Sequence, residues 1–302
     1  MYSSYPKISL VTPVYNQVDY IEATIQSVIT QDYPNLEYII IDGGSTDGTL
    51  EIIKAYEEHL STYVSERDEG MYDALNKGFE HATGDIMGWI NSDDILLPKA
   101  LLTLSKLFTD LPQVNWLQGL NTVIDLKGYI ISTQFPKRFS LITVLNGDYR
   151  WIQQESTFWR RSLWETSGAK INTNLKLAGD FELWFRFFQH ARLYYVAIPL
   201  GAFRKRPGQL SALHYDTYNE EVFDIVVSYS QNQAEKLALK KIRWISFFIR
   251  LLSKLRLFNL NYLESKRYKL LNIEGLDIRY LHDKQQYSLR DNRLLQKERT
   301  EQ

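Results

Sequence analysis

The sequence predicts an α/β fold with a mostly parallel sheet flanked by helices. Over residues 8–90, short runs of β-branched and apolar residues alternate with segments whose apolar residues recur at helical spacing. Polar clusters follow the ends of the predicted strands. Strands that alternate with helices of this length form right-handed crossover units, and such units build a parallel sheet.

The predicted elements follow in chain order. Strands are predicted at 8–14, 36–41, 63–65 and 86–90, and helices at 19–30, 49–59 and 71–81. After Pro98 the pattern predicts a helix to about Leu107, then strands at 115–124, 129–133, 153–159 and 193–198, with a helix at 181–190. Residues 125–128, Asp-Leu-Lys-Gly, are typical of a hairpin turn, so the middle of the sheet is expected to be mixed.

Composition limits the class of protein. A chain of 302 residues with 44% hydrophobic content can bury a substantial core in one or two domains. It has no cysteine, which excludes disulfides, thiolate metal sites and cysteine nucleophiles, so any metal must bind oxygen or imidazole ligands. The N-terminus lacks the pattern of a signal peptide, and no stretch approaches the roughly 18 apolar residues of a membrane span. We therefore expect a cytoplasmic protein.

Charge is distributed unevenly along the chain. Residues 235–302 carry 16 Lys and Arg against 8 Asp and Glu, while the rest of the chain carries 19 against 28. We expect a catalytic body at 1–232 and a basic, amphipathic helical extension at 233–302. Segment 240–258 places a wide apolar face beside a basic stripe. It either lies on an anionic membrane surface or packs on the body with its stripe solvated; we expect no nucleic-acid partner.

Four polar clusters fall where predicted strands end. They are residues 12–16, 42–48, 66–78 and 91–94. Ligands of open α/β sheets bind outside the carboxyl ends of the strands, so these clusters are expected to share one site. Glycines at 43, 44 and 48 let backbone amides approach a ligand closely. The segment GGSTDG is neither a P-loop nor a G-x-G-x-x-G fingerprint, which argues against a kinase or a dehydrogenase.

The last of these clusters contains two adjacent carboxylates, Asp93 and Asp94. Hard divalent ions such as Mg²⁺ bind one or two carboxylates together with the phosphates of a substrate. The alternative is that Ser92, Asp93 or Asp94 caps the helix that Pro98 helps to open.

The order of these motifs resembles one family. The matching segments are SLVTPVYNQVDYIEATIQSVITQDYPNLEYIIIDGGSTDGT, SERDEGMYDALNKGFEHATGDIMGWINSDD, QESTFWRRSLWETSG and LAGDFELWFRF. They are similar to the family 2 glycosyltransferases of the GT-A fold, of the bacterial cell-surface polysaccharide type, over about residues 7–210. The resemblance implies a Rossmann-like mixed sheet flanked by helices, and inverting transfer of a sugar from a nucleotide-diphosphate sugar.

The resemblance also implies roles for single residues. On the nucleotide-sugar side it implicates Thr12, Pro13, Tyr15, Asp42, Asp68 and Asp93, with Asp42 on the base and Asp93 toward the ribose. Asp94 would hold Mg²⁺ or Mn²⁺ on the diphosphate, and Gln154 would line the acceptor side.

Asp180, in AGDFELW, matches the general base of the family. An inverting transfer needs a carboxylate that takes the acceptor hydroxyl proton on the face opposite the leaving diphosphate. The alternative is that Asp180 is only the N-cap of the helix that follows it.

One departure from the family lies in FRKRPGQLS. Many relatives carry a histidine there near the diphosphate, and this chain has Arg206 instead. Arg204 or Arg206 would pair with the diphosphate through charge and fork geometry, or would belong to a basic surface loop.

The expected acceptor is a hydroxyl of a glycan or of a lipid-linked intermediate at the inner face of the cell membrane. Two rivals are a catalytically silent scaffold that binds nucleotide sugar or glycan, and a nucleotidyltransferase. The complete set of carboxylates argues against the first, and VTPVYN is not the glycine- and arginine-rich loop of the second. Four tryptophans are expected either to stack on sugars or to lie in the core: Trp116, Trp151, Trp159 and Trp164.

Overall fold

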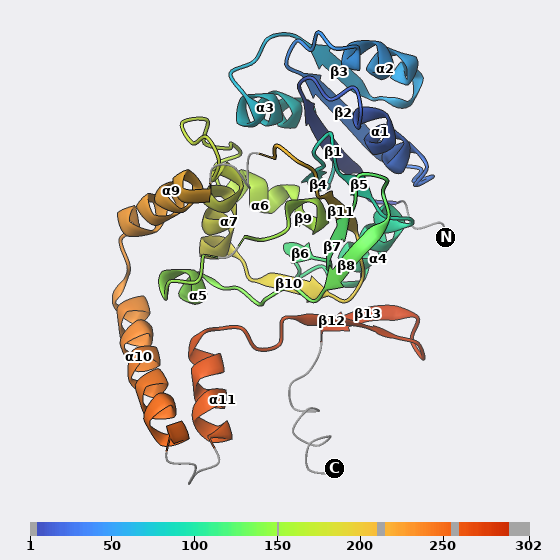
Figure 1. Ribbon diagram of the computed structural model, residues 1–302. Coiled ribbons are helices and arrows are strands. Elements are labelled where there is room, and N and C mark those ends of the chain that lie inside the picture. The colour runs from blue at the N-terminus through green and yellow to red at the C-terminus, as the bar shows by residue number, and fades with distance from the viewer. Residues whose placement is uncertain (1–4, 150, 210–214, 255–259, 290–302) are drawn as a thin grey trace.

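A computed structural model of the protein describes residues 5–149, 151–209, 215–254 and 260–289 (Figure 1). The strands are β1 (Ile8–Val14), β2 (Leu36–Asp42), β3 (Thr62–Ser65), β4 (Ile86–Trp89), β5 (Ile95–Leu96), β6 (Trp116–Gln118), β7 (Asn121–Ile124), β8 (Ile130–Gln134), β9 (Thr157–Arg160), β10 (Leu193–Val196), β11 (Gly201–Arg204), β12 (Asp277–Leu281) and β13 (Gln286–Leu289). The helices are α1 (Ile21–Ile29), α2 (Thr49–Ala55), α3 (Met71–His81), α4 (Ala100–Asp110), α5 (Leu141–Leu145), α6 (Arg161–Thr166), α7 (Gly179–His190), α9 (Tyr215–Ser228), α10 (Gln233–Lys254) and α11 (Asn261–Leu270), with short 3-10 turns η1 (Glu57–His59) and η2 (Gln154–Ser156).

A nine-stranded mixed sheet forms the centre, in the order β13-β12-β10-β6-β9-β4-β1-β2-β3. Strands β4, β1, β2 and β3 are parallel, and β9 runs antiparallel to both of its neighbours. A second sheet of four strands has the order β5-β11-β7-β8. The register of β1 and β2 pairs Val14 with Asp42, so both strands end at the same edge of the sheet.

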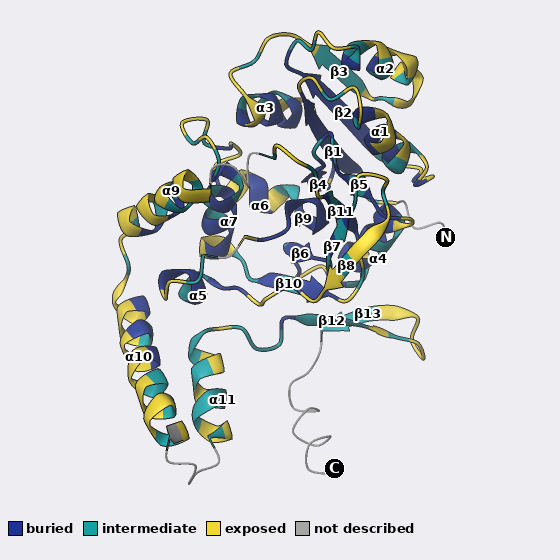
Figure 2. Ribbon diagram, viewed as in Figure 1, coloured by how far each residue is buried: buried dark blue, intermediate teal, exposed yellow. Residues whose placement is uncertain are grey.

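Apolar side chains cover both faces of the large sheet. Helices α1, α2 and α4 pack on one face, and α3, α6 and α7 pack on the other. Alternation along β1 explains this, because Ile8 and Leu10 belong to one core and Val11 to the other. Figure 2 shows the central strands buried along most of their length. Burial on both faces explains why the central strands appear in the sequence as nearly continuous apolar runs.

Most of the tryptophans lie in the core. Trp116, Trp159 and Trp164 are buried, and Trp184 stacks on Trp89 with ring centroids 5.5 Å apart. Stacked and edge-to-face aromatic pairs add stability beyond the area they bury. Of the four tryptophans predicted to be core or sugar-stacking residues, Trp151 is the exposed one.

The predicted helices and strands of residues 8–90 are confirmed with shifts of one or two residues at several ends, except that segment 49–59 divides into α2 and the turn η1. Two later predictions need correction. Segment 115–124 is two strands in different sheets, because the chain leaves the large sheet at Gly119, whose added Cβ would lie 2.6 Å from the Ile198 carbonyl oxygen. Segment 153–159 is strand only from Thr157, since residues 154–156 form a 3-10 turn. The hairpin turn at 125–128 is confirmed between antiparallel β7 and β8.

The C-terminal extension is helical in α10 and α11, as predicted, and then adds strands that the sequence did not predict. β12 pairs in parallel with β10, and Ile278 is buried in the core. The inner face of α10 is also buried through Leu239 and Ile242. No helix among the described residues is long and apolar enough to span a membrane.

Candidate active site

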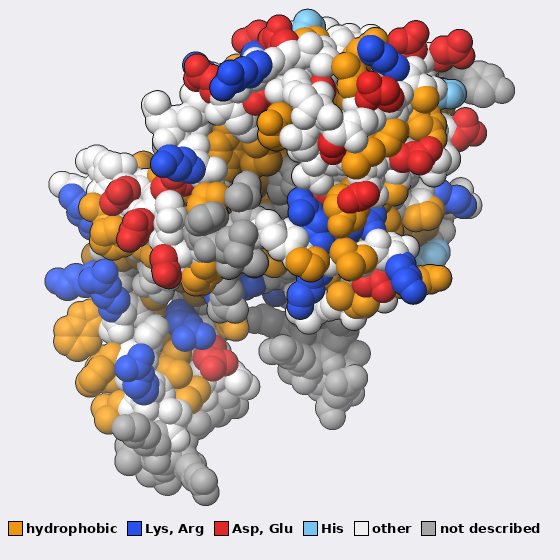
Figure 3. All heavy atoms as spheres, turned by 45° about the horizontal axis from the view of Figure 1, so that its top comes forward, with side chains coloured by type: hydrophobic (Ala, Val, Ile, Leu, Met, Phe, Trp, Pro, Cys, Tyr) orange, Lys and Arg blue, Asp and Glu red, His pale blue; other side chains and the backbone are white. Residues whose placement is uncertain are grey.

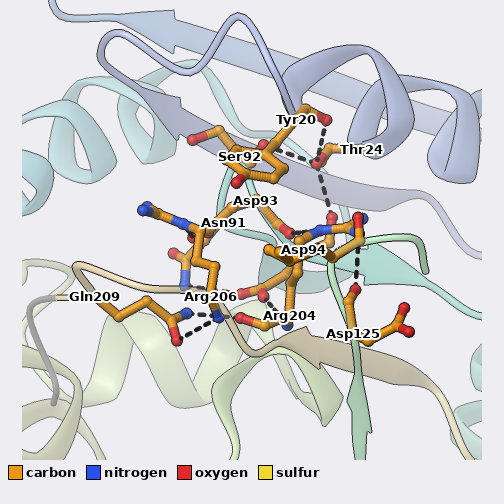
Figure 4. A network of polar contacts seen from close by, with 11 residues as sticks. Tyr20, Thr24, Asn91, Ser92, Asp93, Asp94, Asp125, Arg204, Arg206 and Gln209 are labelled. Atoms are coloured by element: carbon orange, nitrogen blue, oxygen red, sulfur yellow. Dashed lines mark hydrogen bonds and ion pairs between the residues drawn. The ribbon is translucent and has the colours of Figure 1, made fainter. Parts of the chain in front are cut away.

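The chain turns sharply after β4 and places Asp93 and Asp94 between the two sheets (Figure 4). Asp94 is fully buried, and its carboxylate accepts hydrogen bonds from the Arg204 N–H at 2.8 Å and from Asn91 Nδ2 at 3.2 Å. The Thr24 hydroxyl of α1 donates to the Asp94 carbonyl at 2.7 Å. Helix α4 begins at Ala100 with Lys99 as its N-cap, so the interpretation of Ser92, Asp93 or Asp94 as caps is wrong.

Two arginines hold this turn from the end of β11. Arg206 Nε lies 2.6 Å from Asp93 Oδ2 in an ion pair. Arg204 is buried and donates to the backbone carbonyls of Asp93, Asp125 and Leu126. Both guanidinium groups stack over the Tyr20 ring, at 5.6 and 5.4 Å. Because Arg204 is buried, its interpretation as part of an exposed basic loop is wrong.

A further carboxylate, Glu155, joins this site, and the sequence analysis missed it. It is buried and accepts a hydrogen bond from Gln153 Nε2 at 2.5 Å. Its pKa is raised to about 7, mainly by burial; its hydrogen bonds act against this rise, and the charges of Asp93 and Asp180 add to it. Burial, followed by the charge of Glu155, raises the pKa of Asp94 well above its usual range. The only signal in the sequence was a charged residue inside a segment predicted to be a buried strand.

The oxygen atoms near Asp94 fit a hard divalent cation. A carboxylate has about four acceptor positions, so the two hydrogen bonds to Asp94 leave room for a metal. The buried Asn91 Oδ1 and Gln154 Oε1 have no hydrogen-bond partner among the described residues. In the described part of the chain, no group of three acidic or histidine side chains is arranged so that it could hold a metal ion by itself. The residues therefore suit an ion such as Mg²⁺ that takes most of its ligands from phosphates and water.

Asp42 and Asp68 lie together where β2 and β3 end. Asp42 is buried and accepts hydrogen bonds from the hydroxyls of Ser45 and Ser65, at 2.5 and 2.6 Å. The Asp68 carboxyl packs against Gly43, where an added Cβ would lie 2.6 Å from Asp68 Oδ2. Burial raises the pKa of Asp68 above its ordinary value. Glycine at position 43 thus lets the Asp68 carboxyl lie close to the end of β2 without a shift of its side chain.

Thr12, Pro13 and Tyr15, which were predicted to bind the nucleotide sugar, differ in their exposure. The Thr12 hydroxyl lies in the core, 3.1 Å from the Tyr38 hydroxyl, and Pro13 is buried. Tyr15 is 59% exposed and presents its ring at the surface. Asn16 joins this loop to the next one, since its N–H donates to Ser45 Oγ at 2.8 Å.

Asp180 is the second residue of α7, one turn from the aromatic core. Ala178 is the N-cap of the helix, so the alternative interpretation of Asp180 as the cap is wrong. The pKa of Asp180 is raised to about 6, mainly by burial; hydrogen bonds from the N–H groups of Phe181 and Asp180 act against this rise, and the Glu221 charge adds to it. Gly179 allows the Tyr72 ring to approach, because an added Cβ would lie 2.7 Å from it.

Glu221 of α9 fixes the segment that leads into Asp180. Its carboxylate accepts hydrogen bonds from the N–H groups of Lys176, Leu177 and Ala178, at 2.8, 3.0 and 2.8 Å. It therefore satisfies donors at the helix start that lack partners within α7. The sequence analysis missed Glu221 because an acidic residue on a helix surface carries no signal of so distant a contact.

Gln154 occupies the turn between the second sheet and β9. It is buried, and its side-chain amide donates to the Trp89 carbonyl at the end of β4. Gln154 therefore lies beside the Asp93–Asp94 turn, which follows β4. Its neighbour Glu155 is near enough to both Asp93 and Asp180 for their charges to raise its pKa.

A mixed sheet with this acidic site at its carboxyl edge defines an α/β transferase of the GT-A fold, as predicted. The family model for Glycosyl transferase family 2 matches residues 9–178, which is more than half of the chain. The chain belongs to this family.

The chain is similar in sequence to known glycosyltransferases and in fold to solved structures. The chain is 42% identical over 92 residues to the putative teichuronic acid biosynthesis glycosyltransferase TuaG of Bacillus subtilis; the match covers 30% of this chain and 36% of TuaG. The fold resembles that of Staphylococcus aureus TarS 1–349 in complex with UDP-GlcNAc, with a TM-score of 0.61, 20% identity, and coverage of 77% and 70% of the two chains. It also resembles the mannosyltransferase PcManGT of Pyrobaculum calidifontis in complex with GDP-Man and Mn²⁺, with a TM-score of 0.58, 17% identity, and coverage of 90% and 86%.

Replacing Glu221 is expected to loosen the segment before Asp180. Glu221→Ala leaves three backbone N–H groups without their acceptor, so the free energy of unfolding should fall by about 1–3 kcal/mol. Amide hydrogen exchange at residues 176–178 should speed up at the same time. The matched control is Glu220→Ala, at an exposed position of the same helix; equal exchange in both variants would contradict the contact.

Proposed function

We propose that the protein is an inverting glycosyltransferase that moves a sugar from a nucleotide-diphosphate sugar to a hydroxyl of a glycan or lipid-linked acceptor. The observation that carries the proposal is the half-buried carboxyl of Asp180 near the Asp93–Asp94 turn. The charges of Asp93 and Asp180 both raise the pKa of Glu155, which supports a common site for these carboxyls.

Asp180 is the proposed base. It would accept the acceptor hydroxyl proton while the acceptor oxygen bonds to the anomeric carbon and the bond from that carbon to the diphosphate oxygen breaks. A pKa of about 6 suits this role, because the group is ionised near neutral pH and still basic enough to hold a proton. Burial raises the pKa values of the Tyr72 and Tyr218 phenols above the ordinary range, and the charge of Asp180 raises them further.

Donor binding is assigned to the edge formed by β1, β2 and β4. We infer that Asp42 and Asp68 face the base, that Asp93 faces the ribose, and that the exposed Tyr15 covers the nucleotide. Because Thr12 and Pro13 are buried, their contribution would come through the backbone of this loop. Arg206 would interact with the diphosphate by exchanging part of its contact with Asp93, while Arg204 holds the turn.

Asp94 is the proposed metal ligand, with the amide oxygen of Asn91 beside it. A bound Mg²⁺ or Mn²⁺ would stabilise the negative charge that develops on the leaving diphosphate. The Mn²⁺ in the PcManGT complex supports this assignment. Asp94 itself is held in place by the Arg204 N–H, so a cation would meet a fixed carboxylate.

The acceptor and the place of action are inferred from the relatives and from the extension. TuaG is named for teichuronic acid biosynthesis, which supports a cell-envelope polysaccharide as the product class. The basic helix α10 supports a cytoplasmic protein associated with the inner face of the membrane. A silent scaffold is disfavoured, because simple binding of nucleotide sugar would not require a carboxyl with a raised pKa at the position of Asp180.

Asp180→Asn should abolish transfer while the donor still binds. The amide cannot accept the hydroxyl proton, so turnover should fall on the order of 10²- to 10⁴-fold. Release of nucleoside diphosphate from UDP-GlcNAc, GDP-mannose and a wider donor panel measures turnover, and thermal shift with the same donors measures binding. Asp224→Asn, at an exposed position of α9, is the control; full activity in Asp180→Asn would remove Asp180 as the base.

The rate of transfer should follow the ionisation of Asp180. Because the pKa of this carboxyl is raised from 3.8 to about 6, kcat/KM should fall about tenfold per pH unit below pH 6 and level off above it. Glu221→Gln removes a charge that raises this pKa and should move the acid limb to lower pH. If kcat/KM of the wild type falls only near pH 4, the titrating group is not a carboxyl with a raised pKa, and Asp180 is not the base.

Chelation should stop transfer reversibly. EDTA should abolish nucleoside diphosphate release, and added Mn²⁺ or Mg²⁺ should restore it, because the charge on the leaving group loses its stabilising cation. Asp94→Asn should weaken the restoration and raise the metal concentration needed. Activity that persists in EDTA would exclude the metal from the mechanism.

A further inference from the structure

Three aromatic side chains project from the outer face of α10 and contact one another. Trp244, Phe247 and Phe248 are 57%, 56% and 45% exposed. The Trp244 and Phe248 rings stack at 6.2 Å, and the Phe247 and Phe248 rings meet edge to face at 5.8 Å. Aromatic rings gathered in this way on a surface mark an interaction site. We call this surface, together with the cations beside it, the α10 platform.

Cations surround these rings. A hollow of about 480 Å³ on the same face is lined by Lys236, Lys240 and Arg243 together with Trp244 and Phe247. None of these three cations forms an ion pair with a residue in the described ranges. α10 carries six Lys and Arg against one Glu. Figure 3 shows basic and hydrophobic side chains side by side on the lobe formed by α10 and α11.

The start of α10 is firmly attached to the body. Asn232 and Glu235 exchange hydrogen bonds, Glu235 N to Asn232 Oδ1 at 2.9 Å and Asn232 N to Glu235 Oε2 at 2.8 Å, which is a reciprocal cap. Tyr229 donates to Glu235 Oε1 at 3.0 Å, and its ring packs edge to face on Phe185 of α7. The platform is thus held by the helix that carries Asp180.

We propose that the α10 platform binds an anionic phospholipid of the membrane surface, with a phosphate headgroup in the hollow and the aromatic rings in the interfacial layer. Three features favour a lipid surface as the occupant. The inner face of α10 is already buried on the body, which leaves the outer face free to lie along a plane. The cations, which have no ion-pair partner among the described residues, complement anionic headgroups, and aromatic rings favour the interface between water and acyl chains.

This inference deepens the membrane location proposed above and adds the residues and the ligand class. It assigns Lys236, Lys240 and Arg243 to the phosphate, and Trp244 and Phe247 to the interface. Attachment through α10 would hold the acceptor side of Asp180 at a fixed position relative to the membrane, because Tyr229 and Phe185 join the two helices.

Vesicle flotation of the full chain tests the proposal. The vesicles contain phosphatidylcholine alone, or three parts phosphatidylcholine to one part phosphatidylglycerol. We expect flotation with the anionic vesicles only. A triple variant with Lys236→Gln, Lys240→Gln and Arg243→Gln should bind them on the order of a hundred-fold more weakly, since each cation near such a surface contributes about a factor of five.

Two further variants make the test specific. Lys54→Gln, Lys127→Gln and Lys170→Gln remove the same charge from exposed positions of the body and should leave flotation unchanged. Trp244→Ser with Phe247→Ser should reduce flotation and keep the folded state, because both side chains are exposed. Flotation of the platform variants equal to that of the wild type would overturn the proposal, as would a wild type that does not float.

Size-exclusion chromatography with light scattering tests whether a second copy of the chain, rather than a lipid, covers the α10 platform. A dimer that the aromatic variant cannot form would overturn the lipid assignment, and a monomer in both would support it. Nucleoside diphosphate release without vesicles should be the same in all variants, because none of them touches the proposed active site. Failure of transfer and failure of membrane binding are therefore measured separately.

Discussion

The hydrogen bond from the Arg204 N–H to the buried Asp94 carboxylate is the contact on which the site depends. It joins the end of β11, in the small sheet, to the turn that follows β4 in the large one. Without this hydrogen bond, the desolvation of the buried carboxylate would be less well compensated, and the turn would be less stable. The Arg204 side chain then closes the turn by donating to the carbonyl of Asp93. A fixed pair of carboxylates between two sheets follows from this contact.

The segment around Asp180 is also held by a contact between distant parts of the chain. Here a carboxylate accepts hydrogen bonds from backbone N–H groups. Glu221 supplies the acceptor for the segment before α7, and Gly179 lets the Tyr72 ring pack against the start of that helix. Asp180 is therefore not needed as the helix cap, and its carboxylate remains available as a proton acceptor. Behind it, the stacked rings of Trp184 and Trp89 connect α7 to the strand that ends at the Asp93–Asp94 turn.

The C-terminal extension contributes to the body and also presents a surface of its own. β12 adds a strand to the large sheet next to β10, so part of the segment after residue 232 completes the core. α10 divides its two faces between these tasks. Its inner face carries Ile242 into the body, and its outer face exposes Trp244 beside the cations of the platform. The sequence left two alternatives for segment 240–258: contact with an anionic membrane, or packing on the body with the basic stripe solvated. Over the described residues 240–254 the inner face packs on the body, and membrane contact of the outer face stays a prediction.

The sequence by itself determined the alternation of strands and helices, the acidic ends of the strands and the family. These depend on local periodicity and on motifs such as the one containing Asp93 and Asp94, which can be recognised without knowing the fold. The tertiary structure decided that Glu155 joins the site and that Arg204 is buried. It also decided that Glu221 accepts hydrogen bonds from the segment before Asp180. Each of these depends on contacts between segments far apart in the chain, and a side chain's local sequence carries no information about so distant a partner.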